Sequence, residues 1–293
     1  MDLSINLLGV YGAGPGEAPV SVAEAVDRAA DDGFTVYDFP LADLAFYEGD
    51  WRAEIERAQR RAAARGAEFR YTHVPFLFPW ADPSPSNWAR FERAMSQALD
   101  SAARLGVRCA ALHPYTTNEP AGTYDAAPCR RAALEHLEPW LEQAARLGVR
   151  LAVENMQGDA ACRPNRRYCA RVEELVGLVD AINATSGANH GICWDTGHGH
   201  IAGHRQSEAL RAIGPRLAMT HLHDNDAHRD LHLVPYTGTV DWDDVVAGLR
   251  SIGFQGDLNY EMNLKRVPQA LRPPLIDYLR QVGRALLSAM QAP

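Results

Sequence analysis

Six successive apolar segments of the chain end in a histidine or an acidic residue. Imidazole and carboxylate groups bind divalent metal ions, and they also donate and accept protons during catalysis. The six residues are far apart in the sequence, so they form one site only if the fold gathers the ends of these segments. The residues are His73, His113, Glu154, Asp195, His221 and Glu261.

A group of this composition favours a bound metal ion. Clustered carboxylates repel one another, and a divalent cation supplies the compensating charge. Each residue alone also has a structural interpretation, because a strand-end histidine is commonly a hydrogen-bonded rim residue and a strand-end acid commonly caps a helix. That interpretation must hold six times independently, and we therefore expect a functional cluster.

The segments that carry these residues alternate with amphipathic patterns. Short apolar runs are typical of buried strands, and longer runs with apolar residues three and four positions apart are typical of helices. Strands are expected at Leu3–Val10, Phe34–Phe39, Glu68–Val74, Val107–His113, Val149–Glu154, Gly191–Asp195, Leu217–His221 and Asp257–Glu261. Helices are expected near Val22–Ala29, Trp51–Arg65, Ser86–Leu105, Cys129–Leu147, Val172–Ile182, Gln206–Ile213, Asp241–Leu249 and Gln269–Ala289.

Local signals mark several of these boundaries. Ser21 and Glu24 have the spacing of a capping box at the start of a helix. The sequence ARLGVR occurs at Ala103–Arg108 and again at Ala145–Arg150, which indicates a repeated junction between a helix end, a glycine and the next strand.

Eight strand–helix pairs in 293 residues predict an α/β fold, a single-domain (β/α)8 TIM barrel over residues 1–293. A doubly wound open sheet is the alternative, but Gly9, Gly12, Gly14 and Gly16 do not form the GxGxxG loop of dinucleotide-binding sheets. In a closed barrel of this class the carboxyl ends of the strands form the active face. The six strand-end residues would therefore converge on one pocket.

Composition narrows the range of partners. The formal net charge of −8 argues against a broad surface for nucleic acid or anionic membrane. No apolar run approaches the roughly 20 residues that a membrane-spanning helix needs, and the first residues do not resemble a signal peptide. The five cysteines match no metal-binding spacing, and we expect reduced thiols in a cytoplasmic protein. Whether the protein forms a homo-oligomer stays open.

These residues resemble the xylose isomerase-like barrel superfamily, which includes sugar isomerases and epimerases, inosose dehydratases and abasic-site endonucleases. The resemblance implies a metal group of Glu154, Asp195, His221 and Glu261, holding Mn²⁺, Co²⁺ or Zn²⁺. Spacing alone leaves His221 and His223 as alternatives, since residues two apart share a strand face. The resemblance favours His221, because Asp224 stands three residues after it, as in the family pattern.

The resemblance also implies an outer set of residues around the metal. His198 follows Asp195 in an Asp-x-x-His step, which in the sugar epimerases supplies a substrate contact. The arginine that binds substrate in those enzymes has no clear counterpart, since Ala227 stands in its place. The expected substrate-binding residues are His73, His113, His198, Asp230 and His232.

Two enzymatic functions follow from the resemblance. The first is a metal-dependent isomerase or epimerase of a sugar, a sugar phosphate or a polyol ketone, in which Glu154 and Glu261 are the catalytic residues that transfer a proton through an enediolate. The second is a zinc-dependent abasic-site endonuclease, whose nine metal ligands all have counterparts here. The apolar loop FLFPWADPSPS after the third strand and the acidic composition argue against nucleic acid. A regulatory barrel that only binds a metabolite is a third alternative.

Overall fold

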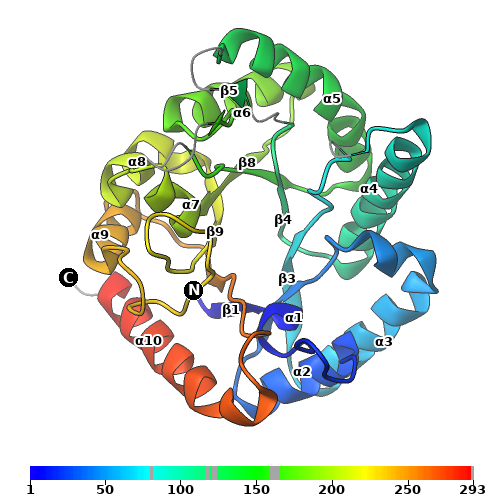
Figure 1. Ribbon diagram of the computed structural model, residues 1–293, viewed down its shortest axis with the longest axis vertical. Coiled ribbons are helices and arrows are strands. Elements are labelled where there is room, and N and C mark those ends of the chain that lie inside the picture. The colour runs from blue at the N-terminus through cyan, green and yellow to red at the C-terminus, as the bar shows by residue number, and fades with distance from the viewer. Residues whose placement is uncertain (80–81, 116–118, 121–123, 159–164, 292–293) are drawn as a thin grey trace.

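Eight parallel strands form a nearly closed barrel, with helices around its outside (Figure 1). The computed structural model describes residues 1–79, 82–115, 119–120, 124–158 and 165–291. Neighbouring strands follow the order β10-β1-β2-β3-β4-β6-β8-β9, and all their pairings are parallel. The strands are β1 (Leu3–Asn6), β2 (Val36–Phe39), β3 (Glu68–His73), β4 (Cys109–Leu112), β6 (Leu151–Glu154), β8 (Gly191–Asp195), β9 (Leu217–His221) and β10 (Leu258–Tyr260).

One long helix follows each barrel strand and covers the outside of the barrel (Figure 1). These helices are α2 (Val22–Asp31), α3 (Trp51–Ala64), α4 (Pro85–Leu105), α5 (Ala126–Leu147), α6 (Val172–Ser186), α8 (Gln206–Ile213), α9 (Trp242–Ser251) and α10 (Pro273–Gln291). Two shorter helices, α1 (Leu7–Val10) and α7 (Thr196–Ile201), directly follow β1 and β8. The (β/α)8 barrel expected from the sequence is confirmed.

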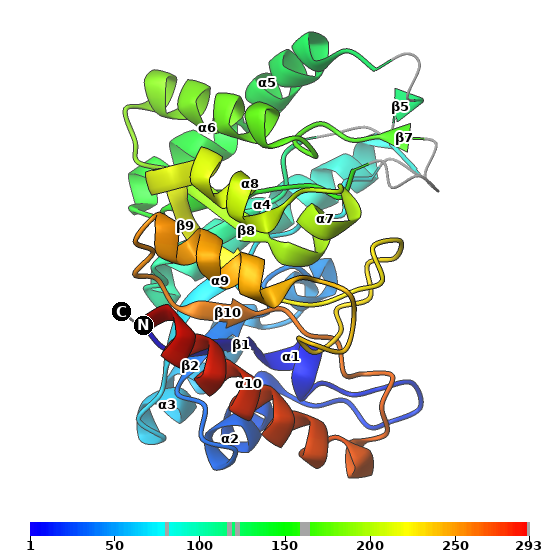
Figure 2. The same ribbon diagram turned by 90° about the vertical axis from the view of Figure 1, so that its left-hand side faces the viewer.

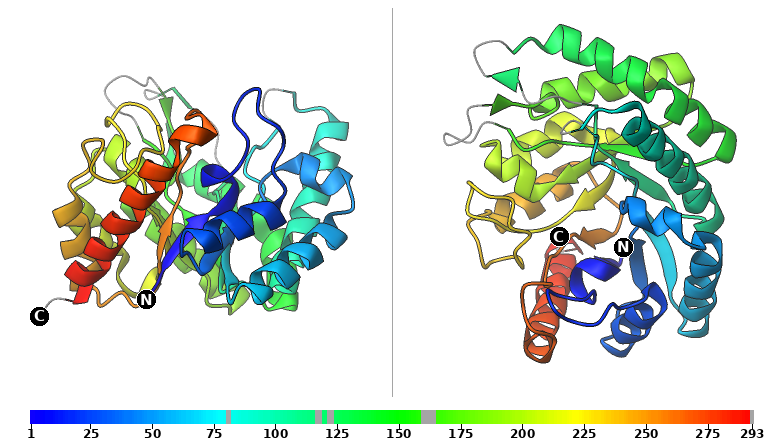
Figure 3. Two further views of the ribbon diagram at one scale, coloured as in Figure 1. Left: turned by 90° about the horizontal axis from the view of Figure 1, so that it is seen from below. Right: turned by 45° about the vertical axis from the view of Figure 1, so that its right-hand side comes forward.

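The longer loops lie at the carboxyl end of the barrel strands. There the short strands β5 (Glu119–Pro120) and β7 (Asn165–Arg166) pair in an antiparallel ribbon beside the barrel mouth (Figure 2). Both chain termini lie at the opposite end of the barrel (Figure 3). In the part of the chain that the structure describes, none of the helices is long and apolar enough to cross a membrane.

The barrel closes between β9 and β10 through few contacts. Leu222, just after β9, forms an isolated parallel bridge with Tyr260. The Leu222 amide donates to the Asn259 carbonyl at 2.9 Å, and the Glu261 amide donates to the Leu222 carbonyl at 3.2 Å. This seam brings the ends of β9 and β10 together, and with them the side chains that follow.

The helix ends follow from local sequence. The Ser21 hydroxyl accepts from the Glu24 amide while the Glu24 carboxylate accepts from the Ser21 amide, which is the predicted capping box. Gly106 and Gly148 end α4 and α5 with φ of 67° and 69°, a left-handed conformation that glycine adopts without steric cost. The repeated ARLGVR segment is therefore the same helix end used twice.

Several predicted boundaries differ from the structure by one to four residues. The strand expected at Leu3–Val10 stops at Asn6, because the Asn6 side-chain amide binds both the amide and the carbonyl of Met262 and turns the chain into α1. The last helix starts at Pro273, after a 3-10 turn at Gln269–Leu271, rather than at Gln269. The helix α5 begins at Ala126, three residues before the expected start at Cys129, because Asp125 caps it.

Candidate metal centre

Four strand ends bring the predicted metal group together. Glu154 ends β6, Asp195 ends β8, His221 ends β9, and Glu261 directly follows β10. One ligand atom from each of these residues lies within 4.8 Å of the others. The first three side chains are buried, and Glu261 is partly exposed towards the cavity. The strand-end rule thus places these four residues of distant sequence position in one cluster.

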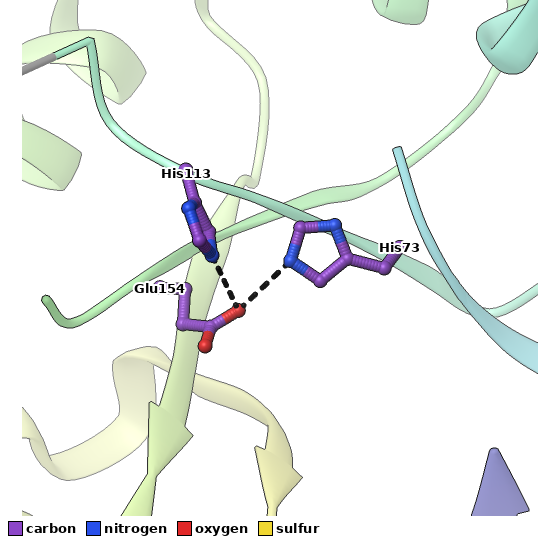
Figure 4. Close-up of side chains that lie close together, drawn as sticks. All are labelled: His73, His113 and Glu154. Carbon is purple, nitrogen blue, oxygen red and sulfur yellow. Dashed lines mark hydrogen bonds and ion pairs between the residues drawn. The ribbon is translucent and has the colours of Figure 1, made fainter. Parts of the chain in front are cut away.

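Imidazole nitrogens surround the Glu154 carboxylate. Its Oε2 lies 3.1 Å from His73 Nε2 and 3.6 Å from His113 Nε2 (Figure 4). The same oxygen lies 3.1 Å from His221 Nδ1, and Oε1 lies 3.3 Å from His198 Nδ1. Burial alone raises the pKa of Glu154, but the neighbouring His221 and His113 outweigh burial and hold that pKa well below its ordinary value. Glu154 is therefore an anion inside the barrel.

Backbone carbonyls fix the tautomer of three histidines. The Nδ1 atoms of His73, His198 and His232 lie 2.6, 2.9 and 2.8 Å from the carbonyl oxygens of Val74, Asn155 and Glu261. A carbonyl oxygen only accepts hydrogen bonds, so Nδ1 carries the proton and a neutral ring has its lone pair on Nε2. Histidine ligands of metals are commonly oriented in this way by a carbonyl behind the ring.

The free nitrogens of these rings point at carboxylates. His73 Nε2 lies 3.1 Å from Glu154, and the Nε2 atoms of His198 and His232 each lie 3.4 Å from Asp230. A lone pair and a carboxylate oxygen repel each other unless a proton or a cation lies between them. The arrangement therefore suits a divalent cation.

The His221 ring also has a nitrogen atom that suits a divalent cation. Its Nδ1 is buried and has no hydrogen-bond partner of acceptable geometry among the residues that the structure describes, although Glu154 and Glu261 lie 3.1 and 3.4 Å away. Its Nε2 faces Asp38 at 4.0 Å. Burial raises the pKa of Asp38 to about 6, and the Asn259 amide donates to this carboxyl at 2.9 Å. A metal ion at Nδ1 would complete the coordination of an otherwise unpaired nitrogen.

A second group lies beside the first. His223 Nε2 is 3.0 Å from Asp195 and 3.8 Å from Asp230, and the His223 ring stacks on His232 with centroids 4.1 Å apart. His223, His232 and Glu261 have ligand atoms within 4.8 Å of one another. His223 stands in the sequence analysis only as the alternative to His221, and the structure gives both histidines a place in the cluster.

In the second group, burial and charged neighbours shift the pKa values in opposite directions. Burial alone lowers the pKa of His232, but Asp230 and Glu261 outweigh it and raise that pKa to about 10. Burial alone raises the pKa of Asp230, but His198 and His232 hold it far below its ordinary value. Asp230 and His232 thus form a close pair of opposite charge.

Three supporting residues escaped the sequence analysis. Asn155 accepts from the Asp195 amide at 2.6 Å and donates to the Asp195 carbonyl at 3.0 Å, which ties β6 to β8. Gly197 leaves room for the His223 ring, because a Cβ atom there would lie 2.0 Å from His223 Cε1. Asp38 is the last residue but one of β2 and lies in an apolar run, and an acidic residue near a strand end is the signal that could have identified it.

Asp224 has a structural role instead. Its buried carboxylate accepts from the Val240 amide and from the Trp242 indole, both at 2.9 Å, and so fixes the loop that carries Asp230 and His232. Asp224, which supported the choice of His221 in the sequence, therefore anchors the loop that follows β9.

Two cavities meet at the cluster. One has a volume of about 340 Å³ and is lined by His113, Glu154, His198, Asp230 and Arg167 among others. The other has a volume of about 620 Å³ and extends towards β1 and β2. His73, Phe76, His232 and Glu261 line both cavities, while Asp195 and His221 lie buried at the cluster. All the predicted substrate-binding residues therefore line the first cavity, beside the metal group.

The comparisons with known proteins agree with this geometry. A family model described as a xylose isomerase-like TIM barrel matches residues 26–282. The chain belongs to the xylose isomerase-like TIM barrel family. An uncharacterized protein of Methanocaldococcus jannaschii is similar to the chain at 26% identity over 214 residues, covering 70% of this chain and 69% of that protein. An uncharacterized protein of Sinorhizobium fredii is 34% identical over 76 residues, which span 26% of this chain and only 24% of that protein.

Solved structures share the fold at low sequence identity. A D-tagatose 3-epimerase-like protein superposes with a TM-score of 0.75 at 18% identity, covering 99% of this chain and 98% of that one. D-Psicose 3-epimerase from Clostridium cellulolyticum H10 gives a TM-score of 0.74 at 17% identity over the whole of both chains. The IOLI protein, whose structure holds a zinc atom, gives 0.72 at 14% identity, covering 99% and 98%.

Proposed function

We propose that this member of the xylose isomerase-like family is a divalent-metal-dependent sugar isomerase or epimerase. The observation that carries the proposal is the pair of carboxylates Glu154 and Glu261, both within 3.4 Å of His221 Nδ1 at the mouth of the barrel. The epimerases among the structural neighbours support the reaction class, and the zinc atom in the IOLI structure supports a metal.

The residues of the metal group fit a divalent ion. Glu154, Asp195, His221 and Glu261 offer three carboxylates and one imidazole, a set that suits Mn²⁺, Co²⁺ or Zn²⁺. A bound ion would polarise the carbonyl of a sugar and so make the proton on the neighbouring carbon more acidic.

The chain's own side chains then carry out the proton transfer. One of the two glutamates removes the proton from the carbon next to the carbonyl through a carboxylate oxygen, which gives an enediolate. The other glutamate starts the turnover protonated and donates its proton to the carbon that is to be protonated, so the two glutamates exchange protonation states until solvent restores them. The Nε2 atoms of His113 and His198, which line the cavity, position hydroxyl groups of the sugar.

A nuclease would use the same side chains differently. Three metal ions would require both groups of ligands and a basic channel for the phosphate backbone. The described residues that line the two cavities include one arginine and one lysine beside several carboxylates. This charge balance favours a sugar over a polyanionic duplex.

Solvent exchange tests the reaction directly. The protein is loaded with Mn²⁺, Co²⁺ or Zn²⁺ and incubated with a panel of ketoses in D2O. Deuterium at the carbon next to the carbonyl, detected by NMR, is the expected result, together with formation of the epimer. The Glu154→Gln and Glu261→Gln variants should lose exchange, and the exposed Glu138→Gln change on α5 should not affect it. Full exchange in both active-site variants contradicts the assigned roles, and incision of an abasic duplex with no ketose exchange favours the nuclease.

A further inference from the structure

Lysine occurs once in the chain. Lysine and arginine together number 29, and all of them except Lys265 are arginine. Lys265 lines the cavity of about 620 Å³ that opens from the metal group, together with His73 and Glu261. All the other basic side chains among the lysines and arginines are arginine, and the single lysine lies on the wall of this cavity.

The backbone around Lys265 is held in place. The amide of Leu264 donates to the Gly9 carbonyl at 2.9 Å, and the amide of Lys265 donates to the Asn263 side chain at 3.2 Å. The chain after β1 also packs against it, since a Cβ atom on Gly14 would lie 2.3 Å from the Lys265 carbonyl. The segment therefore presents the Lys265 side chain from a fixed position, four residues after Glu261.

The carboxylates of this cavity already have partners. Asp38 accepts from the Asn259 amide at 2.9 Å, and Asp43 accepts from the Ala45 amide at 2.9 Å. Glu261 belongs to the metal group and lies 3.4 Å from His221. The exposed Lys265 ammonium forms no ion pair with any residue that the structure describes. The positive charge is thus available to a ligand.

We propose that Lys265 binds an anionic group of the substrate, so that the preferred substrate is an acidic sugar whose carboxylate or phosphate lies at the end remote from the reacting carbons. The proposal rests on the proposed function, because it assumes that the reacting carbons lie at the metal group. A lysine ammonium is a compact point charge on a flexible stem, and it reaches a single anionic oxygen that a rigid guanidinium fork meets less readily. The size of the cavity leaves room for this end of a sugar beside His73 and Glu261.

The single lysine allows a selective test that needs no turnover. Acetylation with an amine-reactive ester modifies Lys265 and the terminal amine, and peptide mass spectrometry measures the rate at each position. The probes are the four D-ketohexoses, their 6-phosphates and the acids with a carboxylate at C6. At least one acidic series should slow acetylation of Lys265 several-fold and leave the terminal amine unaffected, while the neutral sugars should not. Protection by one series alone identifies the phosphate or the carboxylate as the bound group. Equal rates with all three series overturn the proposal.

Matched variants give the second readout. Loss of one hydrogen bond to a charged group lowers kcat/KM by about 10- to 100-fold. The Lys265→Met variant should show this loss for the acidic substrate with little change for the neutral ketose, and Lys265→Arg should recover part of it. The control is Arg266→Met, which removes the neighbouring exposed charge outside the cavity. A Lys265→Met variant that turns over both substrates like the wild type overturns the proposal.

The two proposals fail in different ways. Protection of Lys265 by an acidic sugar without solvent exchange at any ketose would contradict the proposed reaction and support the anion site. Exchange with neutral ketoses without protection by either acid would support the reaction and contradict the role of Lys265.

Discussion

Replacing Glu154 by glutamine should remove most of the stabilisation that metal ions give to the folded protein. The change keeps the size of a side chain that is 1% exposed, and it removes the charge that four imidazole nitrogens face at 3.1 to 3.6 Å. A ligand that binds only the folded state at 100 times its Kd stabilises a protein by about 2.7 kcal/mol. For a chain of this length about 1 kcal/mol corresponds to about 2 °C in Tm, so the wild type should gain about 5 °C.

The variant should gain far less under the same conditions. Loss of a side chain that only supports a metal ligand lowers affinity by about 10- to 100-fold. A loss of about 100-fold for Glu154 itself reduces the stabilisation to about 0.4 kcal/mol, which is less than about 1 °C. Differential scanning fluorimetry of chelator-treated protein with added Mn²⁺, Co²⁺ or Zn²⁺ measures both shifts, with exposed Glu138→Gln as the control. An equal shift in Glu154→Gln and wild type would refute the assignment of Glu154 as a ligand.

Three further changes test other parts of the structure. Gly197→Ala places a Cβ atom 2.0 Å from the His223 ring, so it should destabilise the fold by about 1–3 kcal/mol. It should also weaken metal binding in a calorimetric titration. The control Gly177→Ala, which has open space around its Cβ position, should do neither. Burial lowers the pKa of His136 to about 4, so the folded state favours the neutral ring. The stabilising effect of the neutral ring is present above about pH 6.5 and is lost as the pH falls towards 4. His136→Phe should flatten this part of the curve of urea midpoint against pH, and an unchanged curve contradicts the reasoning. Arg272→Met removes hydrogen bonds to the carbonyls of Gly12 and Val267 and an ion pair with Glu17. The free energy of unfolding, measured by urea titration, should therefore fall by about 3–5 kcal/mol. A fall below about 1 kcal/mol would show that these contacts contribute little.

The barrel was predictable because its signals are local and repeated. Alternating apolar runs and glycine helix ends such as Gly106 and Gly148 define each strand–helix unit without reference to the rest of the chain. The carboxyl-end rule then groups Glu154, Asp195 and His221 from sequence positions alone. The break after Asn6 was not predictable, because it depends on the contact of Asn6 with Met262 at the other end of the chain.

The sequence predicts that the strand-end residues cluster, but it leaves the division of the cluster into two groups open. Sequence spacing leaves His221 and His223 as alternatives. In the structure His221 lies beside Glu154, and His223 lies beside Asp195. The difference arises from the Leu222–Tyr260 bridge and from the space above Gly197, both of which are tertiary features. Asp38 and Asn155 escaped notice because their roles depend on which side chains meet them across the barrel.

The barrel is joined at its seam by an isolated bridge, whereas each other pair of neighbouring strands forms a parallel ladder, two of them with a register irregularity. His221 and Glu261 lie on opposite sides of this seam, 3.4 Å apart. Segments with few backbone hydrogen bonds open first when a protein fluctuates. An ion bound by both residues would cross-link the seam, so we expect the amides of Leu222 and Glu261 to exchange with deuterium more slowly in the metal-loaded protein. The resistance of the chain to proteases would then follow its metal content.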